Sequence, residues 1–319
     1  MPTSETNLAE PTARRFGLQP YLPLMALTTI IWGAAFPITK PGLADMPPAT
    51  FAFLRFVITL IILLPPLFIL RGGWHISRRD WGRVALAGLM GFALIQLGQN
   101  WGLILSLASD ISVLAATEPI SITLLAAFLL GEKPNRAVWL GLLVSLAGVL
   151  LVIGINPLDL FSAGGGAKGD SGSRILGDLI FLFGTLGWAA YNVITRSLSR
   201  RYNGLEMLTG ALIFGLLGLA PFSLLELTVM AQPIRWSGAV VIGLVYSALL
   251  VTIFGFLALS WSLKRVPAAK VALLFYLQPL SGVLVAWLGG EQLSWNFGVG
   301  ALLILAGVYL AEQLGQIEG

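Results

Sequence analysis

Hydrophobic residues in this sequence come in long runs separated by short polar stretches. A bilayer core about 30 Å thick is crossed by a helix of about 20 apolar residues. Helices suit lipid because it offers no hydrogen-bond partner to an unpaired backbone group. The pattern therefore predicts an all-α polytopic membrane protein with ten transmembrane helices, over residues 22–39, 49–70, 81–105, 111–130, 137–155, 176–198, 205–230, 236–262, 268–289 and 295–312.

The composition agrees with a chain whose surface is mostly in lipid. Of its residues 57% are hydrophobic and 11% are charged, and the mean hydropathy is +0.87, outside the range of ordinary soluble domains. The chain has no cysteine and one histidine, which excludes disulfide frameworks, thiol nucleophiles and multi-histidine zinc sites. We expect no metal site and no cofactor. The net charge of +4 comes from short cationic clusters between apolar runs, so nucleic acid is not an expected partner.

Lysine and arginine orient the ten segments. Of the 19 such residues, Lys40, Lys168, Arg174 and Arg235 fall on one side of the membrane, Arg55 lies within a segment, and the rest fall on the other side. Short cytoplasmic loops are enriched in these residues. We therefore expect a multi-pass protein of the bacterial inner membrane with both termini in the cytoplasm.

The sequence also contains an internal repeat. Trp32-Gly-Ala-Ala-Phe-Pro-Ile-Thr-Lys40 aligns with Trp188-Ala-Ala-Tyr-Asn-Val-Ile-Thr-Arg196 at an offset of 156 residues, and Glu118-Pro119 aligns with Gln278-Pro279 at an offset of 160. A nearly constant offset indicates duplication. Because each unit holds five helices, the second copy must start on the opposite side of the membrane, and inverted repeats of this kind support alternating access. The predicted parts are a tail (1–21), a first repeat (22–155), an external linker (156–174) and a second repeat (175–314).

These features resemble the EamA-type transporters of the drug/metabolite transporter superfamily. The resemblance rests on the paired five-helix halves, on Phe53-Leu-Arg55-Phe56, on the prolines after Glu118 and Gln278, and on the Gly-Glu and Leu-Ala-Gly-Val sequences near the end of each half. It implies a ten-helix carrier with a central cavity lined by helices 1, 3, 4, 6, 8 and 9. Aromatic amino acid exporters are the nearest members implied. The second half lacks the Phe-Leu-Arg-Phe motif, so any role of Arg55 is not duplicated.

Polar and aromatic residues inside the segments are the candidates for substrate binding. Glu118 is ionisable deep in a span, where a charge is costly unless paired or protonated. Pro119 and Pro279 are expected to kink their helices and to leave the carbonyl groups of Ala115 and Phe275 free. Further groups share single helix faces at spacings of three and four residues. The predicted substrate-binding set is Gln96, Gln99, Asn100, Trp101, Glu118, Trp188, Tyr191, Asn192, Tyr246 and Gln278.

Each candidate also has a structural interpretation. Glu118 could pair with Arg55, the amides could serve as interhelical contacts, and the aromatic residues could belong to interfacial belts. Arg55 is expected to extend toward the external interface, or else to contact a carboxylate or act as a gate. Glu118, Arg55, Asp110 and Lys270 form the predicted gating or coupling set, although Asp110 and Lys270 could be ordinary helix-end charges.

The favoured function is a secondary transporter or exporter of small amphipathic metabolites, such as aromatic or other neutral amino acids, working by alternating access. A second hypothesis is proton-coupled efflux of organic cations, with Glu118 exchanging a proton for the cation. A membrane-embedded lipid enzyme would need a clustered acid, base or nucleophile at membrane depth, which the sequence does not supply, so we expect no enzyme. The partners expected are a small-molecule substrate and the lipid bilayer, and two halves in one chain are compatible with a functional monomer.

Overall fold

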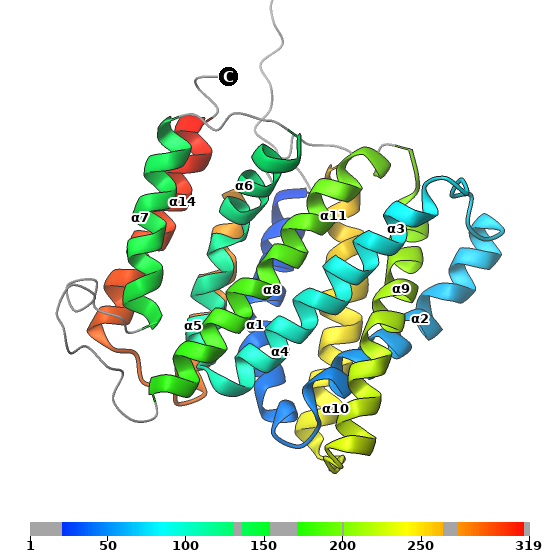
Figure 1. Cartoon of the computed structure of the whole chain (residues 1–319), viewed down its shortest axis with the longest axis horizontal. Coiled ribbons are helices and arrows are strands. Elements are labelled where there is room, and N and C mark those ends of the chain that lie inside the picture. The colour runs from blue at the N-terminus through cyan, green and yellow to red at the C-terminus, as the bar shows by residue number, and fades with distance from the viewer. Residues whose placement is uncertain (1–20, 131–135, 154–170, 200, 264–272, 316–319) are drawn as a thin grey trace, which may run out of the picture.

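A computed structural model describes residues 21–130, 136–153, 171–199, 201–263 and 273–315, and all regular structure in these ranges is helical (Figure 1). The α-helices are α1 (Tyr21–Leu43), α2 (Pro48–Arg71), α3 (Trp81–Gly88), α4 (Ile95–Leu105), α5 (Ala108–Leu114), α6 (Glu118–Leu130), α7 (Arg136–Ile153), α8 (Ser171–Leu198), α9 (Gly204–Leu224), α10 (Gly238–Val245), α11 (Gly255–Leu263), α13 (Leu277–Leu288) and α14 (Trp295–Gly315). The predicted all-α class is confirmed.

Five helical stretches in the described ranges are long and apolar enough to cross a membrane, and a sixth is added if a bent pair counts as one span. The five are Pro48–Arg71, Trp81–Leu105, Gly172–Leu198, Gly204–Val229 and Gly238–Ser262. Large apolar side chains on these helices point outward, as shown by Ile69, which is 79% exposed. The protein is therefore a multi-pass membrane protein whose outer surface suits lipid.

Four irregular segments interrupt the helices in matched pairs. The π-helical segments η1 (Leu89–Leu94) and η5 (Tyr246–Phe254) start 157 residues apart (246 − 89). The 3₁₀ segments η2 (Ala115–Thr117) and η6 (Leu273–Tyr276) start 158 residues apart (273 − 115). Both offsets match the sequence repeat, so the two halves share their distortions as well as their helices. A further π-helical segment, η4 (Leu225–Val229), ends the helix that starts with α9.

The turn η2 separates α5 from α6, and the stretches 108–117 and 120–129 meet at an angle of 41°. The predicted free carbonyl at Ala115 is wrong, because its oxygen accepts a hydrogen bond from the backbone N–H of Glu118. In an α-helix the donor to this carbonyl would be the N–H of residue 119, which proline lacks. The tighter 3₁₀ turn uses the N–H of Glu118, one residue earlier, instead.

Close packing of helices positions the central part of the molecule. Helix α7 runs along α14 at one edge, and α4 runs along α8 near the middle (Figure 1). At the second contact a Cβ atom on Gly98 would lie 2.6 Å from the Cα atom of Gly184, so only glycine fits there. Small residues of this kind let membrane helices approach closely. The predicted tail, most of the linker, and Lys270 lie outside the described residues.

Candidate functional site

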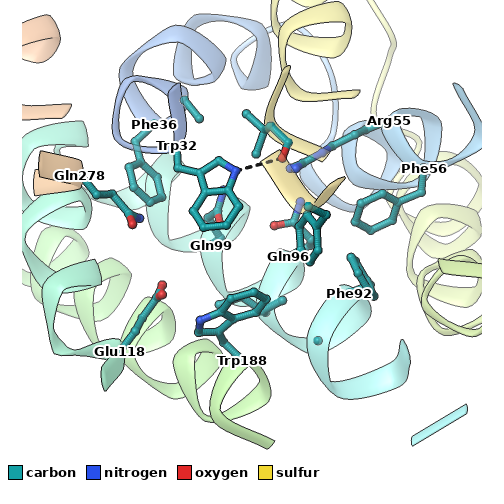
Figure 2. Close-up of a pocket in the computed structure, with 15 residues that line it drawn as sticks. Trp32, Phe36, Arg55, Phe56, Phe92, Gln96, Gln99, Glu118, Trp188 and Gln278 are labelled. Carbon is teal, nitrogen blue, oxygen red and sulfur yellow. Dashed lines mark hydrogen bonds between the residues drawn. The ribbon is translucent and has the colours of Figure 1, made fainter. Parts of the chain in front are cut away.

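A cavity lies in the middle of the helix bundle, where helices from both halves meet (Figure 2). Its cavity volume is about 90 Å³, which is smaller than the roughly 300–1,000 Å³ of typical small-molecule sites. Its lining residues are Trp32, Ala35, Phe36, Arg55, Phe56, Gly91, Phe92, Ile95, Gln96, Gln99, Glu118, Trp188, Val251, Phe256 and Gln278.

Two repeat-related pairs face this cavity. Trp32 from α1 and Trp188 from α8 line it together, and so do Glu118 from α6 and Gln278 from α13. Each pair comes from corresponding positions of the two sequence units. The cavity therefore lies at the interface of the repeats, where transporters built from inverted repeats bind their substrates.

Aromatic rings form much of the cavity wall. The Trp32 ring centroid lies 5.9 Å from that of Phe256, and Trp188 contacts the same ring edge-on at 5.9 Å. Phe92 approaches Phe256 at 5.4 Å. These separations are within the range of favourable ring pairs, so the indoles are held by neighbours and present fixed surfaces to a ligand.

The distorted segment η5 fixes the position of Trp32. The indole Nε1 of Trp32 donates to the carbonyl oxygen of Val251 at 2.9 Å (Figure 2). In a regular helix that carbonyl would be taken by an N–H four residues later. The indole also fits because Gly255 lies beneath it, where a Cβ atom would be 2.2 Å from Trp32 Nε1.

Arg55 is buried inside the bundle and lines the cavity. Its side chain does not extend to the interface as predicted, because the residue is only 6% exposed and Nε and Nη2 donate to Thr252 Oγ1 at 3.0 and 2.8 Å. The guanidinium also lies 5.4 Å from the ring centroid of Phe56, a cation–π distance. Within the described ranges no carboxylate lies within salt-bridge distance of Arg55.

Two further polar groups at the cavity wall lack partners in the part of the chain that the structure describes. Nε2 of Gln96 is buried and has no hydrogen-bond acceptor. Glu118 has neither a hydrogen bond nor an ion pair, so it is not paired with Arg55 (Figure 2). Buried polar groups are normally satisfied, so these two groups are exceptions at the cavity wall.

Several predicted substrate-binding residues do not line the cavity. Asn100 is buried and donates through Nδ2 to the carbonyl of Pro48. The hydroxyl of Tyr246 donates to the carbonyl of Ile31, and Asn192 donates to the carbonyl of Trp188 on its own helix. Tyr191 stacks behind Trp188 at 5.3 Å and 12°, while Trp101 is half-buried outside the lining. Asn100, Asn192 and Tyr246 thus each donate to a backbone carbonyl, and none of these five residues lines the cavity.

The predicted gating residues fall in different places. Glu118 and Arg55 are at the cavity. Asp110 is buried away from the cavity, in the first turn of α5, where it accepts two hydrogen bonds from Arg174. Asp110 therefore forms a bidentate ion pair with Arg174 and is not a simple helix-end charge.

Sequence reasoning missed nine of the fifteen residues that line the cavity, among them Trp32, Phe36, Phe92 and Phe256. A signal existed for Trp32, because it is the repeat partner of Trp188. The three phenylalanines carried no such signal, since phenylalanine in an apolar run is as compatible with lipid as with a cavity.

A central cavity between two repeats of membrane helices is the arrangement of many transporters. The model of the EamA-like transporter family matches residues 19–154 and 175–312, so the chain belongs to this family and contains two copies of its domain.

An uncharacterized transporter of Archaeoglobus fulgidus is 27% identical over 288 residues, covering 90% of this chain and 95% of that protein. A probable terminal-alkyne amino-acid exporter of Streptantibioticus cattleyicolor is 29% identical, covering 91% of this chain and 92% of that protein. A crystal structure with 21% sequence identity matches the fold with a TM-score of 0.60, covering 92% of this chain and 97% of the other.

Proposed function

We propose that this transporter exports small amphipathic metabolites, above all amino acids, including aromatic ones, by alternating access. The observation that carries the proposal is the placement of Arg55 and Glu118 on opposite sides of an aromatic cavity (Figure 2). Neither side chain has an oppositely charged partner among the described residues.

Charge complementarity favours a ligand with two opposite charges. An isolated ion inside a membrane protein is expensive, and such groups face substrate pathways or pair with each other. The carboxylate of an amino acid suits Arg55, whose planar guanidinium binds carboxylates with directed hydrogen bonds. The ammonium group suits Glu118. The unpartnered Nε2 of Gln96 supplies one more donor.

The space between these charges suits a flat apolar side chain. Trp32 and Trp188 lie between Arg55 and Glu118 in the cavity (Figure 2), and aromatic faces pack well against aromatic ligands. The relative from Streptantibioticus cattleyicolor, named as a probable amino-acid exporter, supports the same substrate class.

The proposed architecture is ten spans in two inverted halves. In the described ranges the helices and their irregular segments join into ten rods, counting α3–η1–α4, α5–η2–α6, α9–η4, α10–η5–α11 and η6–α13 as one each. The paired irregular segments and the two family matches support the duplication. We place the protein in the bacterial inner membrane with both termini cytoplasmic, with repeats over 22–155 and 175–314, and it functions as a monomer.

The test is counterflow of labelled aromatic and aliphatic amino acids in proteoliposomes, with and without a pH gradient. Saturable exchange is expected for the wild type. Arg55→Lys should lower the exchange rate at least tenfold, because the compact ammonium group of lysine cannot replace the planar guanidinium group that Thr252 holds in position. Arg78→Lys is the matched control, since Arg78 is exposed in a loop. Absence of amino acid exchange would overturn the substrate assignment.

Glu118 separates this proposal from its main alternative, proton-coupled efflux of organic cations. An unpaired carboxyl group beside Trp188 is a favourable environment for a cation. If cations are the substrates, Glu118→Gln abolishes their pH-driven efflux while Arg55→Gln spares it. If amino acids are the substrates, both variants lose exchange, while Asp45→Asn, in a loop outside the cavity, keeps it.

A further inference from the structure

A cluster of charged residues lies away from the cavity, where the ends of α1, α4, α5 and α8 meet the loop before α14. Its members are Lys40, Asp110, Arg174, Asp178 and Glu291, and we call it the charge cluster. None of them lines the central cavity. In the topology proposed above, which this inference adopts, the cluster lies at the external end of the bundle.

Two of the three carboxylates in the charge cluster are compensated. Asp110 accepts from Arg174 Nε at 2.5 Å and from Nη2 at 2.9 Å. Glu291 lies 3.3 Å from Lys40 Nζ and accepts from the backbone N–H groups of Ala108 and Ser109 at 2.9 and 3.0 Å. The two cations of the cluster are therefore committed to Asp110 and Glu291.

The third carboxylate, Asp178, forms no salt bridge with any residue in the described ranges. Its exposed fraction is 0%. Oδ1 lies 2.5 Å from Ser106 Oγ, and Oδ2 is buried with no hydrogen-bond partner in the described ranges. A buried carboxylate with one hydrogen bond and a second carboxylate nearby is strongly disfavoured as an anion.

Ser106 links the two aspartates and indicates how the charge is removed. Its Oγ lies 2.5 Å from Asp178 Oδ1 and 3.3 Å from Asp110 Oδ2, and a hydroxyl has only one proton to donate. If Asp178 is protonated, its O–H donates to Ser106, and the Ser106 hydroxyl donates onward to the charged Asp110.

We propose that Asp178 is a proton-binding site that holds a hydrogen ion while these helix ends are packed together and releases it when they separate and water reaches the carboxylate. Acid on the external side then favours the packed arrangement, and alkaline conditions favour its opening. The site links transport to external pH independently of Glu118.

No other charged group in the described ranges substitutes for this role. The elements against α8 contribute Asp110 from α5, Lys40 from α1 and Glu291 from the loop, and α8 itself contributes Arg174. The charges of α3, α6 and α7 lie elsewhere. Arg83 of α3 pairs with Asp80 at the opposite end of α8, and Glu118 of α6 is at the cavity. Arg136 is the first residue of α7, whereas the Val152 carbonyl that contacts Arg174 is in the last turn of that helix.

The sign of the effect follows from linkage. Because the packed arrangement holds one proton that the open arrangement releases, the ratio of open to packed molecules rises by up to about tenfold per pH unit over the range where this proton is exchanged.

Infrared difference spectroscopy of the full chain in lipid tests the proposal without any substrate, so its failure is distinct from failure of the proposed amino acid transport. Spectra recorded between pH 4 and 9 should show the C=O stretch of a protonated carboxylic acid that disappears on alkalinisation. The band should persist in Glu118→Gln and vanish in Asp178→Asn. A band lost with Glu118→Gln but kept in Asp178→Asn would overturn the proposal, as would the absence of any such band.

A second variant covers the possibility that Asp178→Asn does not fold. Ser106→Ala keeps the carboxyl group but removes its hydrogen-bond partner, so the same band should move to higher frequency. The variant Ser77→Ala, whose hydroxyl contacts Asp80 outside the charge cluster, should leave it in place. An unchanged band in Ser106→Ala would assign the proton to another group and contradict the proposal.

Discussion

Arg55 of the first half and Thr252 of the second half are joined by two hydrogen bonds, from Nε and Nη2 to the same hydroxyl oxygen at 3.0 and 2.8 Å. Thr252 in turn donates to the carbonyl of Ser247, five residues earlier in η5. The π-helical segment thus places an acceptor in front of the buried arginine, and the two repeats are connected at the edge of the cavity.

Thr252→Val should impair substrate binding through Arg55. Valine keeps the shape but removes the oxygen, which leaves part of a buried guanidinium unsatisfied at a cost of about 1–3 kcal/mol. We expect an increase of about tenfold in the KM for exchange with a smaller change in maximal rate. The control is Thr228→Val, because Thr228 is exposed and bonds only to the Leu224 carbonyl on its own helix. Equal KM values for both variants would show that Thr252 does not position the arginine.

Gly98→Ala should force α4 and α8 apart. The added Cβ would lie 2.6 Å from the Cα atom of Gly184, and a backbone atom cannot move aside as a flexible side chain can. Overpacking of this kind costs about 1–3 kcal/mol, so the thermal midpoint in detergent should fall. Gly82→Ala is the matched control, since no atom lies within 4 Å of its Cβ position, and its midpoint should be unchanged. A stable Gly98→Ala would mean that the two helices adjust freely.

How much of this could be predicted from the sequence depends on the kind of interaction. Runs of apolar residues determine helices because lipid forbids unpaired backbone groups, so the all-helical class and the repeat were accessible. The π-helical segments were not, because shifting one hydrogen bond leaves the hydrophobic pattern unchanged. Leu89–Leu94 and Tyr246–Phe254 look like ordinary helix in the sequence.

Within the candidate site, the polar residues themselves were easier to predict than the groups to which they bond. Glu118 and Gln96 stood out as polar residues in apolar segments, and both line the cavity. The partner of a buried polar group depends on helix packing, however, and the sequence does not contain that information directly. Glu226 illustrates this, because it accepts from the N–H groups of Ala49 and Thr50 at the start of α2, a helix in the other half of the chain.

Glu291 should make the folding stability of the protein decrease at acidic pH. It lies in the loop between α13 and α14, where burial raises its pKa as the largest single effect, but hydrogen bonds from Ser109 and Ala108 and the charge of Lys40 together hold the pKa below its ordinary value. A lowered pKa contributes stability above the unfolded value of about 4.3, and this contribution is lost as the pH falls through the folded value.

The measurement is thermal unfolding in detergent from pH 7 to pH 3. Glu291→Gln should lower stability by about 1–2 kcal/mol near neutral pH, the value of a helix cap, and should flatten the acid limb of the curve. Asp45→Asn, in another loop at the same end of α1, provides the comparison and should keep the wild-type acid limb. The same acid limb in Glu291→Gln and wild type would exclude a stabilising charge at this position.

Inverted repeats predict that corresponding loops lie on opposite sides of the membrane. Ala44 and Arg201 are corresponding exposed positions 157 residues apart (201 − 44), and Arg78 and Arg235 have the same separation (235 − 78). The natural chain has no cysteine, so a single introduced cysteine is the only thiol. In intact cells a membrane-impermeant maleimide should label Ala44→Cys and Arg235→Cys, but it should label Arg78→Cys and Arg201→Cys only after lysis. Labelling of both members of a pair from the same side would contradict the inverted arrangement, and with it the assignment of the charge cluster to the external end.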